Sequence, residues 1–73
     1  MNELKSVSEN TPFIIEEIKD SHLKSRFYDM GIYPNQTIEV IRRTPFGDPI
    51  IVEVEGNLIM LRSDEADLIV IRK

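Results

Sequence analysis

The sequence predicts a small, mainly β fold: a barrel of about five short strands, with one helix inserted after the first strand and a short helical turn before the last. Apolar and polar residues alternate with a period of two over several segments, as they do along a half-buried strand. Glycine, proline and asparagine separate these segments. With 73 residues, the chain is too short to divide into two units that each hold a core, so we expect one domain over residues 1–73.

Strands are expected where the period is two, or where a short apolar run is rich in β-branched residues. The five predicted strands cover Pro12–Ile18, Thr37–Arg43 and residues 50–55, 58–62 and 68–71. Residues 44–49 contain two prolines and a glycine, which a central strand does not tolerate, so this segment is predicted to be a reversal loop. Residues 55–57 offer a tight turn for a hairpin.

Helical signals occur at two places. The spacing i, i+4, i+7 predicts a helix over residues 21–30, and its apolar face is formed by Leu23, Phe27 and Met30. Asp20 or Ser21 is expected to cap this helix, and Gly31, with Pro34 shortly after it, is expected to end it. Ser63 is expected to cap one further helical turn with an acidic start. A small SH3-like barrel fits this order best, and an open sheet with the helix on one face is the alternative.

Composition excludes several classes of function. The chain is 41% hydrophobic and 30% charged, which is typical of a globular protein, and its net charge of -4 opposes binding to nucleic acid or anionic lipid. It has no cysteine, so disulfides, thiolate nucleophiles and the commonest zinc ligands are missing. Neither a signal peptide nor an apolar run of roughly 20 residues is apparent, so we expect a cytoplasmic protein.

The sequence offers few residues for catalysis or for binding a metal ion. His22 is the only histidine, and with Asp20 it gives too few ligands for a metal site within one chain, although a site shared between two chains stays open. The acidic residues of segment 50–55 are expected to mark the solvated face of a strand. The three isolated glycines do not form a phosphate-binding loop. We therefore expect no enzyme activity, no cofactor and no metal site in the single chain.

Five side chains are candidates for contact with a partner protein: Phe46, Arg42, Arg43, Tyr28 and Tyr33. Phe46 lies in the proline-bounded loop, where an exposed aromatic ring can anchor an interface. The alternative is that Phe46 folds back and plugs the mouth of the barrel. Arg42 and Arg43 could face an acidic partner, or could simply be solvated residues at a strand end. Weak self-association through an exposed strand edge also stays open.

Three segments resemble the FeoA family, ferrous iron transport protein A. They read MGIYP at residues 30–34, TIEVIRRTPFGDPI at residues 37–50 and LRSDEADLI at residues 61–69. The loop of residues 43–49 is the most specific of these features. Asn10 and Asn35 stand where the family often has glycine. Asparagine tolerates the left-handed backbone, so we expect both turns to be kept.

The resemblance implies an SH3-like barrel that assists ferrous iron uptake by binding FeoB, a membrane permease with a cytoplasmic GTPase region. It implies regulation or stabilisation of that permease, and it supplies no catalytic residue. A second hypothesis is a module that binds or responds to a transition metal through His22 and carboxylates, either within one chain or across a dimer.

Overall fold

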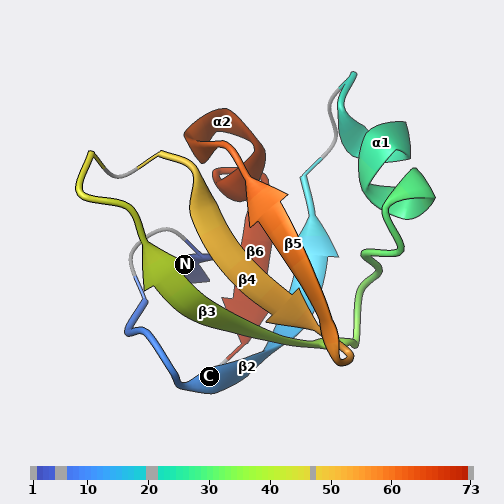
Figure 1. The fold of residues 1–73 in the computed structure, drawn as a ribbon. Coiled ribbons are helices and arrows are strands. Elements are labelled where there is room, and N and C mark those ends of the chain that lie inside the picture. Colours follow the sequence, from blue (N-terminus) through green and yellow to red (C-terminus); the bar gives the residue numbers. More distant parts are fainter. Residues whose placement is uncertain (1, 5–6, 20–21, 47, 73) are drawn as a thin grey trace.

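The structure is a computed structural model that describes residues 2–4, 7–19, 22–46 and 48–72. Strands and two short helices follow one another in the order shown in Figure 1. The elements are β1 (Asn2–Glu3), β2 (Pro12–Ile18), α1 (Lys24–Asp29), β3 (Thr37–Arg43), β4 (Ile50–Val54), β5 (Asn57–Leu61), α2 (Ser63–Ala66) and β6 (Ile69–Arg72).

All six strands of the described chain form one antiparallel sheet in the order β1-β6-β2-β3-β4-β5. Irregularities in register occur between Ile15 and Glu17 and between Val40 and Arg42. Such bulges bend a strand and increase its twist, which lets a short sheet curve around its own core. The five predicted strands correspond to β2 through β6, and β1 is an additional strand that the sequence did not predict.

The core lies inside the curve of the sheet. Strand β4 alternates buried and half-buried residues along its whole length, and in β3 the alternation brings Ile38 and Val40 to the inner face. Ile38 pairs with Val54 and Val40 with Val52, so the inward residues of neighbouring strands meet. Phe27 of α1 contributes the largest of the fully buried side chains, with 1% exposure. This confirms its expected place in the core.

Helix α1 is shorter than predicted. It covers six residues rather than the ten expected, and Leu23 occupies the N-cap position without a side-chain hydrogen bond. The expectation that Asp20 or Ser21 caps the helix is therefore wrong, because helical hydrogen bonding begins farther along the chain; both residues lie outside the described part. The predicted end is confirmed. Gly31 has φ +84°, its N–H donates to the Tyr28 carbonyl at 3.0 Å, and the Ile32 N–H donates to the Phe27 carbonyl at 2.9 Å, which is a Schellman motif.

Helix α2 is present where expected, but Ser63 is its first residue and not its cap. Arg62 holds the N-cap position. The free N–H groups of this end are satisfied from elsewhere: Glu65 Oε1 accepts from Arg62 N at 2.9 Å, and Asp48 Oδ1 accepts from Ser63 N at 2.9 Å. Asp48 thereby fastens the loop between β3 and β4 to the start of α2.

The two turns with asparagine in place of glycine are kept, as predicted. Asn10 has φ +61° and Asn35 has φ +74°, so both take the left-handed backbone. The hairpin between β4 and β5 has positive φ at both central residues, Glu55 (+49°) and Gly56 (+88°). This is the geometry of a two-residue turn whose twist matches that of the flanking strands.

Candidate partner-binding surface

Phe46 is the most exposed large apolar side chain described, at 95% exposure. It lies in the loop between β3 and β4, which Figure 1 shows projecting from one end of the sheet. The alternative in which Phe46 plugs the barrel is therefore wrong, because aliphatic residues of the strands already fill the interior. Asp48 restrains the loop on one side through the Ser63 N–H and lies 3.8 Å from Arg62 Nη1.

Arg42 and Arg43, at the end of β3, have different roles. The Arg42 side chain is exposed. Arg43 is half-buried: its N–H donates to Glu9 Oε2 at 2.8 Å, and its Nη2 donates to the Leu4 carbonyl at 3.3 Å. Arg43 thus connects the base of the loop to the N-terminal segment, and Arg42 is the arginine of this pair that is available to a partner.

Tyr28 and Tyr33 form a pair at the end of α1. Their ring centroids are 5.3 Å apart and the ring planes are tilted by 43°. The Tyr33 hydroxyl also donates to the Tyr28 carbonyl at 3.3 Å. In Figure 1, α1 and the loop of residues 44–49 lie on opposite sides of the molecule. The five candidates therefore form two separate groups, with Phe46, Arg42 and Arg43 in one and the tyrosines in the other.

Of the two residues considered for metal binding, the structure describes only His22. His22 is exposed, and Asp20 lies outside the described residues. Within residues 2–4, 7–19, 22–46 and 48–72, no three histidine, aspartate or glutamate side chains are placed to share a metal ion. Glu55 instead accepts a hydrogen bond from the Thr37 N–H through Oε2 at 2.8 Å, so it has a structural contact at the hairpin turn.

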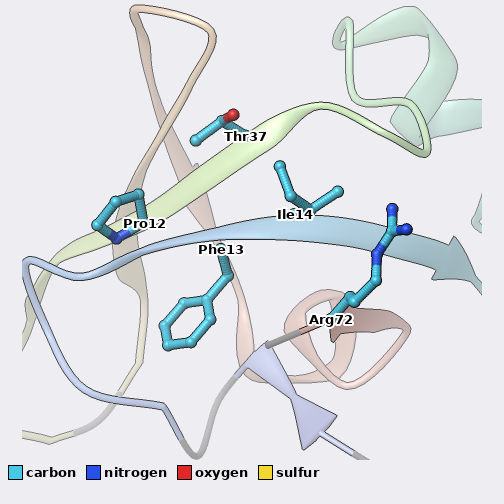
Figure 2. A pocket seen from close by; sticks show the side chains of 5 residues that line it. All are labelled: Pro12, Phe13, Ile14, Thr37 and Arg72. Carbon is cyan, nitrogen blue, oxygen red and sulfur yellow. The ribbon is translucent and has the colours of Figure 1, made fainter.

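A shallow apolar hollow of about 530 Å³ was not anticipated from the sequence. It is lined by Pro12, Phe13, Ile14, Thr37 and Arg72. Ile14 pairs with Thr37 on one side and with Arg72 on the other, which places these side chains in one row across β3, β2 and β6. Figure 2 shows Pro12, Ile14 and Thr37 on one side of the strand and the Phe13 ring on the other. The lining holds one guanidinium and no acid–base pair, so the hollow suits apolar contact better than a reaction.

Neither helix of the described chain has the length or the hydropathy that a bilayer-crossing segment requires.

Several solved structures with the same fold are of FeoA or iron(II) transport proteins. Iron(II) transport protein A from Clostridium thermocellum superposes with a TM-score of 0.89 at 32% identity, covering 96% of this chain and 44% of that one. The FeoA-like protein from Clostridium acetobutylicum gives 0.89 at 28% identity, covering 97% of this chain and 84% of that one. FeoA of Stenotrophomonas maltophilia, solved with zinc and described as an SH3 domain protein, gives 0.84 at 22% identity, covering 99% and 91%.

The present chain covers less than half of the C. thermocellum protein, which is therefore more than twice as long as the region that superposes. The S. maltophilia likeness supports the SH3-like architecture that the order of elements predicts. A comparison with curated protein sequences finds no significant match. The FeoA domain model matches residues 2–73. The chain therefore belongs to the FeoA domain family, which is associated with iron transport.

Proposed function

We propose that this protein is a non-enzymatic docking module of ferrous iron uptake, which binds the cytoplasmic GTPase region of the FeoB permease through the loop of residues 44–49. The observation that carries the proposal is the placement of Phe46, a 95% exposed ring on a restrained loop, within a FeoA domain. Binding at this loop would stabilise the permease assembly or adjust its nucleotide cycle.

The physical argument for Phe46 as an anchor is one of area. A Phe side chain buries about 150–250 Å² in a socket. Fully burying a Phe side chain contributes about 1.5–3 kcal/mol before the costs of association are subtracted. Because Asp48 holds the loop against the start of α2, less loop entropy is lost on binding than in an unrestrained loop. A restrained aromatic side chain of this kind has the features of an interface hot spot.

The charges around the loop specify the partner further. Arg42 is exposed at the end of β3, and the Arg62 side chain is 75% exposed beside Asp48. An apolar socket bordered by carboxylates on the partner would match Phe46 with these guanidinium groups, because complementary charges steer the encounter and set the orientation. The net charge of -4 makes these local positive groups stand out against the rest of the surface.

Arg42 could also act on the nucleotide cycle directly, as an arginine that reaches the transferred phosphate. Arg43 is a poor choice for this role, since its guanidinium already donates to the Leu4 carbonyl. Measuring GTP hydrolysis by the FeoB GTPase region, with and without this protein, separates the two modes of action. Stimulation that is unchanged by Arg42→Ala would eliminate the direct role and leave docking alone.

A pull-down with the FeoB GTPase region tests the docking itself. Wild-type protein is expected to be retained, Phe46→Ala to be lost, and Tyr28→Ala to be retained, because the tyrosine pair lies on the other side of the molecule. Loss with Tyr28→Ala and retention with Phe46→Ala would move the interface to α1. Failure of the wild-type protein to be retained would refute the proposal.

A further inference from the structure

Strand β5 ends the sheet, and its outer edge carries no strand in the described chain. The sheet order places β5 beside β4 only, and Figure 1 shows it at the front of the molecule. Its side chains Leu58 and Met60 are 69% and 65% exposed. These two and Phe46 are the most exposed large apolar residues described. Free strand edges are ready to pair with another strand unless a charge, a proline or a bulge prevents it.

None of these protections is present in β5. The strand reads NLIML, without charge or proline, and its register with β4 is regular from Asn57 to Leu61. By contrast, the β2–β6 and β3–β4 pairings both contain an irregularity. The edge is therefore free of bulges, uncharged and apolar on its exposed face.

The direction of the backbone groups follows from the hairpin. Val54 and Asn57 close the two-residue turn and exchange both hydrogen bonds, and bonded and non-bonded pairs alternate from there. Asn57, Ile59 and Leu61 thus bond to β4, and the N–H and C=O groups of Leu58 and Met60 point out of the sheet. Within the described chain, the backbone hydrogen bonds outside helices and strands include none from these two residues.

We propose that β5 pairs with β5 of a second copy of this chain, antiparallel, with the two-fold axis at Ile59. In this register Leu58 of one copy lies opposite Met60 of the other, and these are the residues whose backbone groups are free. The same pairing brings both exposed side chains of each copy into one apolar cluster on the outer face. The strand is self-complementary about Ile59, and this selects a second copy over an unrelated strand.

The inference goes beyond the docking function proposed above and does not depend on it, because it rests on Leu58 and Met60 of β5, which are not part of the proposed docking surface. Only one five-residue strand of each copy takes part, so we expect the contact to bury less than the roughly 1,200 Å² of a stable interface and the dimer to be weak, with a dissociation constant on the order of 100 µM.

Sedimentation equilibrium from about 10 µM to about 1 mM covers this affinity. The average mass of the wild-type protein is expected to rise from one chain toward two. Met60→Lys places a charge on the edge and should keep the chain monomeric, and Phe46→Lys, the same kind of change on the loop, should leave association unchanged. A wild-type mass that stays at one chain over the whole range would overturn the proposal.

A charge exchange tests the register. Leu58→Lys and Met60→Glu each place a charge against an apolar side chain at both symmetric contacts, so each variant alone should dimerise at least about tenfold more weakly. In the mixed dimer of the two variants, Lys at position 58 of one copy lies opposite Glu at position 60 of the other, and the second contact is that of the wild-type protein, so association should exceed that of either variant alone. If the mixture associates no better than either variant alone, the proposed register is wrong.

Discussion

Glu65 Oε2 lies 3.2 Å from Arg26 Nη1, and this ion pair joins the two helices of the fold. Glu65 is the one charged side chain that is buried among the described residues, with 5% exposure. Its other oxygen accepts from the Arg62 N–H at 2.9 Å, so a single carboxylate both holds α1 and completes the start of α2. Asp48, in the loop that carries Phe46, also binds the start of α2 by accepting from the Ser63 N–H. Glu65 therefore stabilises the helix to which this loop is attached.

Glu65→Ala removes both contacts and is expected to lower the free energy of unfolding by about 2–3 kcal/mol. Glu65→Gln keeps an acceptor for the Arg62 N–H and should lose about 1 kcal/mol, because the Arg26 side chain is 64% exposed and an exposed pair contributes little. Denaturation in urea measures both values. Equal losses for the two variants would show that the ion pair, and not the hydrogen bond to α2, stabilises this region.

Phe27 and Phe46 should differ strongly in how much they contribute to the stability of the fold. Phe27→Ala opens a cavity in the core and is expected to lower stability by about 3–5 kcal/mol. Phe46→Ala removes a side chain that contacts solvent and should change stability by less than about 0.5 kcal/mol. Thermal unfolding of the two variants provides the comparison. A large loss with Phe46→Ala would mean that the ring packs on the protein in solution.

Arg43→Ala is expected to destabilise the fold by about 1 kcal/mol, since it removes the hydrogen bond from the guanidinium to the Leu4 carbonyl and the packing of a half-buried side chain. Arg42→Ala, its matched control, should have no effect on stability beyond about 0.5 kcal/mol. Unfolding midpoints in guanidinium chloride distinguish the two. The assignment of a structural role to Arg43 fails if the order of the two effects is reversed.

Asn35→Gly and Asn35→Ala separate backbone conformation from side-chain bonding. With φ +74°, this position favours glycine, so Asn35→Gly should be close to neutral even though the 3.3 Å contact from Arg72 Nη2 is lost. Asn35→Ala loses the same contact and adds the left-handed strain of about 1–2 kcal/mol. A difference of this size in unfolding free energy is expected between the variants, and equal stabilities would contradict it.

The strands could be predicted closely because their information is local. Alternation and the turn residues placed β2 and β3 at the residues where the structure has them. Strand β1 could not be found in this way, because Asn2–Glu3 is a two-residue polar segment whose only structural signal is its pairing with Val70 and Ile71 of β6. The start of α1 was also misplaced, since capping residues were available before the point where hydrogen bonding begins.

The candidate site could be predicted only in part, because some of its features are local in the sequence and others depend on contacts between distant residues. The exposure of Phe46 follows from a local feature, a loop bounded by prolines, although the sequence left the plugged alternative open. The sequence could not distinguish the structural role of Arg43 from the exposed position of Arg42, because the hydrogen-bond partners of Arg43, Glu9 and Leu4, are 34 and 39 residues away. The separation of Tyr28 and Tyr33 from the loop likewise depends on how the sheet curves, which no local pattern records.

The most direct test of the docking account is a calorimetric titration of the FeoB GTPase region with wild-type protein and with Phe46→Ala. The account predicts that the variant unfolds at the wild-type temperature and binds at least about tenfold more weakly, as expected for a hot-spot residue. Equal affinity for the two proteins would contradict the assignment of the loop as the contact surface.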